Sequence, residues 1–307
     1  MALTTPSVTA EVVARQLRGG KVDRGGVAFR AVLLISLLFT VAVLGLLLVR
    51  VTSGSIDVWS ARGVGDFVQR VYTGDAEDSG VYQGLVGSIS IAVVVLLLAV
   101  PLGVAAAVYL EEYAPRSRFT QLIDTNIRNL AGVPSVVYGI LGYTVFVKAL
   151  RGFTGGASVM AAGITLAILV LPIVIITSAE AVRAVPESLR EAGFGVGATR
   201  WEVVRGHVLP YALPGILTGT ILSLARALGE AAPLILVGAQ VGFFTRGDPG
   251  DLTGPFTALP NLIARWTALP QGRWAGNVQA AIVVLLLLVL AINATAILLR
   301  NRYEKKR

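Results

Sequence analysis

The chain consists of long runs of apolar residues separated by shorter polar segments. Six runs are long enough to cross a bilayer, because a helix needs about 20 apolar residues to span a hydrocarbon core of about 30 Å. They lie at about 27–49, 84–110, 122–147, 159–179, 213–238 and 277–299. Gly132 and Pro134 interrupt the third run, so it is expected to face protein or a cavity rather than lipid. The pattern predicts an all-α integral membrane protein with six transmembrane helices.

Composition agrees with a membrane environment. Of the 307 residues, 55% are hydrophobic and 14% are charged, whereas an average soluble domain carries about 25% charged residues. The net charge of +8 suggests a nucleic-acid partner, but the positions of the charges argue against one. With the N-terminus inside, the inner segments hold 17 of the 26 Lys and Arg residues, the outer segments hold 8, and Arg226 lies within a span. This bias predicts that both termini are cytoplasmic and leaves no basic stripe for nucleic acid.

The segments outside the apolar runs complete the predicted organisation. The sequence divides into a cytoplasmic tail (1–26), one membrane domain (27–299) and a basic cytoplasmic tail (300–307). The first apolar run is too long for a signal-peptide core and no small-residue cleavage site follows it, which predicts a retained membrane helix. The outer loop 51–83 predicts a short amphipathic helix around 64–72. The outer loop 239–276 is rich in Gly, Pro and aromatic residues, including Phe243 and Phe244, which suits a structure at the headgroup level.

The inner loop 180–212 is too polar to span and predicts a first short helix. Pro186 suits the first position of a helix, because its missing N–H and fixed φ are tolerated there. The glycines at 193, 195 and 197 are then expected to end this helix, since each permits the positive φ of a tight turn.

A second short helix follows in the same loop. Thr199 and Glu202 have the spacing of a capping box, so this helix is expected to begin near Arg200. It is expected to end at Pro210. The loop therefore predicts a helix-turn-helix at the inner membrane surface.

Two interpretations of this loop stay open from the residues. It is either an amphipathic element that rests on lipid headgroups through its arginines, or a docking surface for a cytoplasmic partner. Glu187, Glu191 and Glu202 favour docking, because a lipid-binding surface would not place carboxylates next to anionic lipid.

The spacing of this loop resembles the EAA loop of ABC-importer permeases, in which EAA is followed by Gly and, further on, by Leu-Pro. Two residues depart from that pattern: Gly193 stands for the third-position Ala, and His207 stands for Ile. The resemblance implies ATPase coupling by Glu187, Glu191, Ala192, Gly197, Leu209 and Pro210.

Further stretches resemble the phosphate ABC-importer permease family, and within it the PstA-type subunit. They are AVYLEEYAP (107–115), NLAGVPSVVYGILG (129–142), LPIVIITSAEAVRAVPESLREA (171–192), GATRWEVVRGHVLP (197–210) and LARALGEAAPLILVGA (224–239). The pair Glu111-Glu112 favours the PstA type over the related PstC type. The resemblance implies the type I ABC importer permease fold, with a cytoplasmic EAA coupling helix-turn-helix, in a prokaryotic cytoplasmic membrane.

The family also implies the partners and the substrate, which is inorganic phosphate. These partners are a PstC-type sister permease, two copies of a PstB-type cytoplasmic ATPase and an extracytoplasmic PstS-type phosphate-binding protein. The sequence independently requires a separate ATPase, because it contains no GxxxxGK[ST] phosphate loop. No cofactor is expected on this chain, and ATP and Mg²⁺ are expected on the partner ATPase.

Charged and polar residues inside the spans are candidates for the translocation pathway. An arginine at the centre of a span costs about 2.5–3.5 kcal/mol, so Arg226 is expected to have a partner. Glu230 lies four residues later, on the same face of a continuous helix. The pair either neutralises itself and locks the helix in the bundle, or lines the anion path or its gate. Asn129 and Ser135 flank the interruption of the third span, which is either a wall of the pathway or a packing kink.

Three other functions compete with phosphate import: import of another oxyanion, intramembrane catalysis and passive conduction. A permease for another oxyanion, such as sulfate or molybdate, stays open because no residue identifies the anion. An intramembrane enzyme is disfavoured, since Glu230 is the one acid deep in a span and His207 lies at the inner face. The chain has no cysteine, which excludes disulfides and thiol nucleophiles. A passive channel has no use for an ATPase dock.

Overall fold

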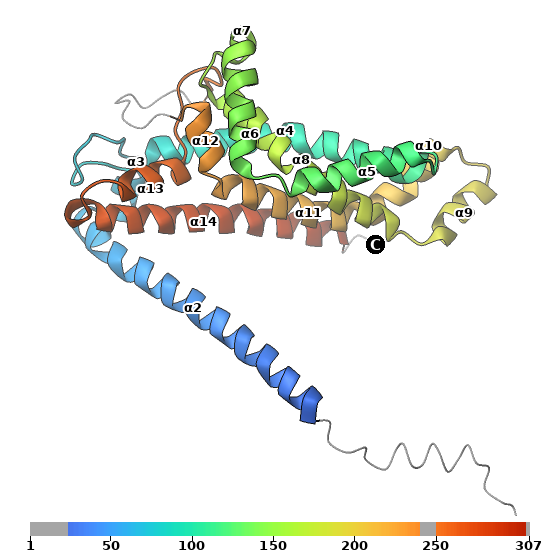
Figure 1. The fold of residues 1–307 in the computed structure, drawn as a ribbon, viewed down its shortest axis with the longest axis horizontal. Helices are drawn as coiled ribbons and strands as arrows, with labels where there is room; N and C mark the ends of the chain where they lie inside the picture. The colour runs from blue at the N-terminus through green and yellow to red at the C-terminus, as the bar shows by residue number, and fades with distance from the viewer. Residues whose placement is uncertain (1–23, 240–249, 305–307) are drawn as a thin grey trace, which may run out of the picture. The chain divides into compact units, whose positions relative to one another are not determined.

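A computed structural model of the chain describes residues 24–239 and 250–304, and all regular elements in these ranges are helices (Figure 1). The chain divides into two compact units, Met1–Ser53 and Gly54–Arg307. Most of the predicted N-terminal tail, the end of the basic tail, and Phe243 and Phe244 of the second outer loop lie outside the described residues.

The first apolar run forms a helix that is longer than predicted. Helix α2 (Arg24–Arg62) extends beyond the expected end at residue 49, so that the outer loop is shorter than its sequence suggested. Its most apolar stretch has a mean hydropathy of 3.0 and is exposed. A helix that is apolar on all sides suits a membrane crossing. The short helix predicted around 64–72 is present as α3 (Val64–Gln69).

Two parallel helices form the centre of the second unit. Helix α4 (Tyr82–Val108) packs along α8 (Val159–Arg183), with Gly163 facing Val94 and Gly103 facing Val174. A Cβ atom on Gly103 would lie 2.6 Å from Val174 Cγ1. Small residues allow such close approach of helices within a membrane. Because residue numbers rise together along both helices, α4 and α8 run in the same direction.

The chain between α4 and α8 must therefore return across the membrane. It does so through α5 (Arg118–Ala131) and α6 (Ser135–Leu141), which continues into the π-helical segment η2 (Gly142–Ala149) and the short α7 (Arg151–Thr154). The two halves of this crossing are bent by 101°, and Figure 1 shows α6 standing away from the direction of α4 and α8. The predicted interruption is confirmed, and with this bent pair the described residues contain up to six candidate spans.

The fifth span is also interrupted, beside Pro233, where a proline within an apolar run favours a kink. Helix α11 (Leu209–Gly229) ends before Glu230, and α12 (Ala232–Val237) follows it. The sixth span is α14 (Gln271–Glu304), which is preceded by the short α13 (Leu259–Thr267). Arg300 Nη1 donates to the Thr218 hydroxyl at 3.1 Å and so links α14 to α11.

The core of the second unit has three parts. One lies between α4, α8, α11 and α12, and contains Leu166, Val170 and Leu228. A second joins α3, α13 and α14 and includes Trp266 and Trp274, whose ring centroids are 5.3 Å apart. The third lies where α4, α8 and the inner loop meet and consists mainly of valines: Val108, Val182, Val185, Val203, Val204 and Val208. The inner loop is thus anchored to the ends of two spans.

Candidate functional site

The inner loop forms the predicted helix-turn-helix, with two differences in its first half. Helix α9 (Glu187–Gly195) begins after Pro186, whose ψ of 136° is not helical, so the proline precedes the helix instead of opening it. Of the three glycines, Gly197 alone has a positive φ, +81°, while the other two lie within α9. The tight turn therefore depends on one glycine.

Gly193 explains why this loop departs from the EAA pattern. It is the one buried residue of α9, and a Cβ atom there would lie 2.7 Å from Val203 Cγ2. Val203 belongs to α10 (Arg200–Val203), so the missing methyl group allows the two short helices to pack closely.

The second half confirms the capping box and corrects the predicted end of the helix. The Thr199 N–H donates to Glu202 Oε2 at 2.7 Å, and the Glu202 N–H donates to the Thr199 hydroxyl at 3.4 Å. The helix does not end at Pro210, because α10 continues through the π-helical η3 (Val204–Val208) into α11. Pro210 directly follows η3, and this widened π-helical segment accommodates the missing N–H within the continuous helix. The helix-turn-helix is thus continuous with the fifth span.

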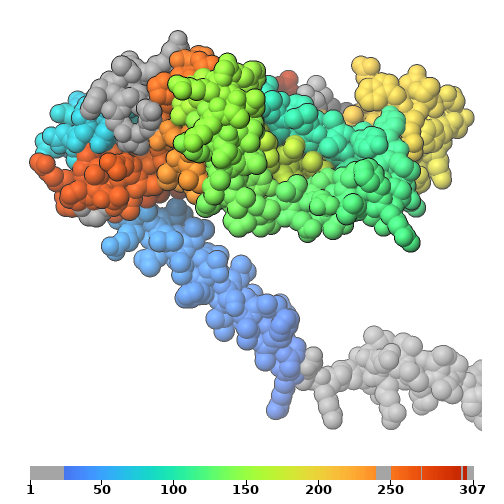
Figure 2. All heavy atoms as spheres, turned by 45° about the horizontal axis from the view of Figure 1, so that its top comes forward, coloured from blue at the N-terminus to red at the C-terminus, as the bar shows by residue number. Residues whose placement is uncertain are grey.

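The outward surface of this element combines carboxylates with large apolar side chains. Glu187, Glu191 and Ala192 are exposed, whereas Leu209 and Pro210 are half-buried. Phe194, Val196 and Trp201 are 48%, 83% and 55% exposed. These three residues were not among the predicted docking residues, although large apolar side chains within a polar loop are a signal that the sequence contains. Figure 2 shows the element, in yellow, at one end of the second unit. Large exposed apolar side chains beside carboxylates are typical of a protein contact.

The arginines of the loop are largely engaged within the chain. Arg183 forms an ion pair with Glu111, Arg190 with Glu112 at 2.9 Å, and Arg200 stacks over Tyr113 with 5.4 Å to the ring centroid. The acceptors lie in the π-helical η1 (Tyr109–Tyr113), which extends α4. Three of the four arginines that a headgroup-binding surface would use are therefore already occupied, which favours docking over lipid binding.

The intramembrane pair forms at the break in the fifth span. Arg226 Nε lies 3.6 Å from Glu230 Oε1, with side chains 42% and 20% exposed. Arg226 is in the last turn of α11, and Glu230 has extended backbone angles (φ −81°, ψ 119°). The two residues therefore do not share the face of one helix, as the spacing had suggested. The positive charge instead lies at the carboxyl end of α11, where the helix dipole favours it.

The two interrupted spans pack against each other. A Cβ atom on Gly139 of α6 would lie 2.8 Å from the Cα atom of Pro233 in α12. The Tyr138 hydroxyl donates to the Leu130 carbonyl at 2.9 Å, which links the two halves of the bent span. Tyr138 was not among the predicted residues. The one feature of the sequence that points to it is a tyrosine hydroxyl close to the interruption at Gly132 and Pro134. Asn129 is exposed at the end of α5, and Ser135 is half-buried at the start of α6.

These contacts join the two interrupted spans, but they bring only two of the four predicted pathway residues together. Arg226 and Glu230 meet. The contacts of the described residues do not place Asn129 or Ser135 against the ion pair.

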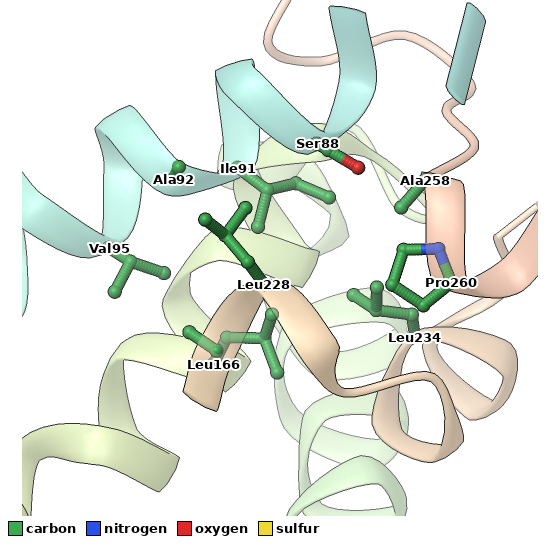
Figure 3. Close-up of a pocket in the computed structure, with 10 residues that line it drawn as sticks. Ser88, Ile91, Ala92, Val95, Leu166, Leu228, Leu234, Ala258 and Pro260 are labelled. Atoms are coloured by element: carbon green, nitrogen blue, oxygen red, sulfur yellow. The ribbon is translucent and has the colours of Figure 1, made fainter. Parts of the chain in front are cut away.

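A small apolar cavity lies beside the break in the fifth span (Figure 3). Its volume of about 10 Å³ is about the space of one water molecule. Ile91, Leu166 and Leu228 point into it, and Ser88 contributes a hydroxyl at its edge. A cavity this small and apolar is unsuited to an oxyanion. Within the described ranges, no group of three or more His, Cys, Asp or Glu side chains is arranged to hold a metal ion.

The fold and the helix-turn-helix define a membrane-spanning subunit of an importer. A family model described as binding-protein-dependent transport system inner membrane component matches residues 99–307, and the chain belongs to this family.

Its similarity to individual relatives identifies the branch. The chain is 36% identical over 230 residues to phosphate transport system permease protein PstA 1 of Mycobacterium tuberculosis, which covers 74% of this chain and 73% of that protein. It is 39% identical over 218 residues to PstA of Mycobacterium leprae, covering 70% and 68%. The resemblance to PstA-type permeases is confirmed.

Solved structures support the fold alone. A bacterial alginate ABC transporter in complex with a periplasmic protein matches 90% of this chain and 96% of its own, with a TM-score of 0.64 and 15% identity. The inward-facing MetNI methionine ABC transporter matches 72% and 94%, with a TM-score of 0.57 and 19% identity. The predicted type I importer permease fold is confirmed, and the chain is a multi-pass membrane component of an ABC importer.

The contact between the two interrupted spans makes a testable prediction. Gly139→Ala should destabilise the protein by about 1–3 kcal/mol, because the added methyl group meets backbone that cannot rotate away. Gly152→Ala is the matched control, since a Cβ atom there has no neighbour within 4 Å. Thermal unfolding of the detergent-purified variants measures both changes. Equal melting temperatures for the two variants would show that α6 and α12 are not in close contact.

Proposed function

We propose that this chain is the PstA-type permease subunit of an ATP-driven importer and translocates inorganic phosphate across the cytoplasmic membrane. The observation that carries the proposal is the exposed acidic and aromatic surface of α9 and α10, placed at the start of a helix that continues into the fifth span. The phosphate substrate is supported by relatives that are named phosphate transport permeases. Sulfate or molybdate import is the alternative, but these names do not favour it.

The partners follow from the same assignment. Two copies of a PstB-type ATPase bind ATP and Mg²⁺ on the cytoplasmic side, and one of them docks on α9 and α10 of this chain. A PstC-type sister permease forms the other half of the pathway, and a PstS-type protein delivers phosphate from outside. Both termini are cytoplasmic. This chain contributes no nucleotide site, in keeping with the absence of a phosphate-binding loop from its sequence.

The docking residues fall into two groups. Glu187, Glu191 and Ala192 are exposed and suit direct contact with the ATPase, together with Phe194 and Trp201. Gly197 shapes the turn between the helices, while Leu209 and Pro210 form the junction with α11. When the ATPase closes, α9 and α10 move as a body, and the continuous helix carries the displacement into the membrane.

The far end of that helix is the break that holds Arg226 and Glu230. The arginine's planar guanidinium can hold two phosphate oxygens and stays charged at physiological pH. Glu230 competes for the same guanidinium, so it releases Arg226 to the anion in one state and reclaims it in another. This pair acts as a gate, and Asn129 and Ser135 at the other break line the path.

The docking proposal predicts separate effects on assembly and on membrane insertion. Glu191→Lys should reverse a charge on the docking surface, and Gly197→Val should strain the turn, because φ is +81° there while the space around it is open. Both variants should reach the membrane but lose co-purification with the ATPase, or hydrolyse ATP without phosphate uptake. Glu77→Lys, the same charge change on an exposed residue of the outer loop, is the control. If both loop variants bind the ATPase and couple ATP hydrolysis to phosphate uptake normally, the loop is instead an amphipathic element that rests on lipid headgroups.

The gate proposal predicts that the charge pair is needed for transport after assembly. Arg226→Gln should assemble with its partners but import no phosphate, and Glu230→Gln should perturb uptake without loss of folded protein. A purely structural pair predicts instead that each single variant lowers the amount of complex and that the double Gln variant restores it. Phosphate uptake per assembled complex, measured in vesicles, separates the two. Parental uptake by the double variant would leave the pair as a helix lock.

A further inference from the structure

The end of α4 receives three arginines from the inner loop. The segment η1 is π-helical, a widened turn that often occurs at functional sites. Three consecutive residues of it each engage one arginine, in the pairs Glu111 with Arg183, Glu112 with Arg190, and Tyr113 with Arg200. The first arginine belongs to α8, the second to α9 and the third to α10. The end of α4 is therefore in contact with both helices of the docking element.

The central pair is the most buried of the three. The side chains of Glu112 and Arg190 are 8% and 12% exposed, and Nε and Nη2 donate to the same carboxylate oxygen at 3.1 and 2.9 Å. Nη2 also donates to the Val182 carbonyl at 3.0 Å, and Nη1 donates to the Val185 carbonyl at 2.7 Å. A buried charge pair is stable only when its remaining hydrogen-bonding groups are satisfied in this way. One guanidinium thus joins α9, the end of α8 and the end of α4.

Helix α9 has two further attachments, because half-buried Leu189 packs on the valine core of the inner loop and Gly193 packs on α10. Gly193, its one buried residue, packs against Val203 of α10, and its remaining surface is half-buried or exposed. A displacement of α9 reaches the end of α8 through the Val182 carbonyl, and it also reaches two other spans. One route runs through Val203 into α10 and α11, and the other runs through Arg190 and Glu112 into α4.

The second route leads to the same break as the first. Ile91 and Val95 of α4 line the apolar cavity, and they face Leu228 and Leu234 on either side of Glu230 (Figure 3). A shift of α4 along this cavity changes the wall against which the break is packed.

We propose that the Glu112–Arg190 pair is a second mechanical link of the importer, which transmits the motion of α9 to α4. Glu112 and Arg190 are positioning residues: they touch neither phosphate nor nucleotide, and they act through the helices that they join. This inference rests on the proposed function. It adds a route that does not pass through the continuous α10–α11 helix.

The test compares transport per ATP hydrolysed with assembly. Glu112→Gln keeps the shape of the side chain and one hydrogen-bond acceptor but removes the negative charge. Arg190→Lys keeps the positive charge but removes the planar guanidinium, whose Nε and Nη2 both donate to Glu112. In the reconstituted importer, both variants should co-purify with the ATPase and hydrolyse ATP. The ratio of phosphate imported to ATP hydrolysed should fall about tenfold, within the range by which mutations between coupled sites alter their coupling. Glu111→Gln is the control, because its partner Arg183 lies outside the docking element, and its ratio should equal the parental one.

Each outcome decides the matter. A parental ratio in assembled Glu112→Gln and Arg190→Lys complexes overturns the link. Loss of assembly in both variants, with normal assembly of Glu111→Gln, also overturns it, because a clamp that serves folding alone predicts that result. Failure of the proposed function is seen separately, as a parental complex that binds no ATPase or imports no phosphate.

Discussion

The structure depends on one constraint: backbone polar groups inside a bilayer must find partners within the protein. Both interrupted spans obey it by packing on each other. The bend between α5 and α6 is held by the Tyr138 hydroxyl on the Leu130 carbonyl, and α6 approaches α12 so closely that Gly139 has no room for a methyl group. An isolated break would expose unpaired carbonyl and amide groups to lipid. Two adjacent breaks create a protein-lined region in which an ion pair is tolerated.

Under the proposed function, this arrangement would carry the motion of a cytoplasmic ATPase into the membrane. The docking element is attached to the fifth span through an unbroken helix and to α4 through a buried guanidinium. A rigid connection transmits displacement, whereas a break accommodates it. Rigid segments therefore lie between the proposed docking surface and the breaks, which we propose line the pathway. The Arg226–Glu230 pair lies at the break that ends α11, which is the place expected of the proposed gate.

Features set by local chemistry could be predicted from the sequence, and features set by packing could not. Apolar runs identify spans because every helix that crosses the hydrocarbon core needs about 20 apolar residues. The Thr199–Glu202 capping box is predictable because it forms between residues that are close in the sequence. The continuation past Pro210 was missed because the π-helical η3 accommodates the proline. Pro233 favours a kink near Glu230, but its close contact with Gly139 of α6 depends on packing. The pairing of Arg190 with Glu112, 78 residues apart, depends on the parallel packing of α4 and α8.

The central claim is that this chain passes phosphate when a partner hydrolyses ATP. Its most direct test uses proteoliposomes that contain this permease, a PstC-type partner and the ATPase, with ATP and Mg²⁺ on the ATPase side and phosphate-loaded binding protein on the other. The account predicts accumulation of labelled phosphate that requires ATP hydrolysis and is not competed by sulfate or molybdate. Accumulation of sulfate or molybdate instead of phosphate, or phosphate flux that persists without ATP, would contradict it.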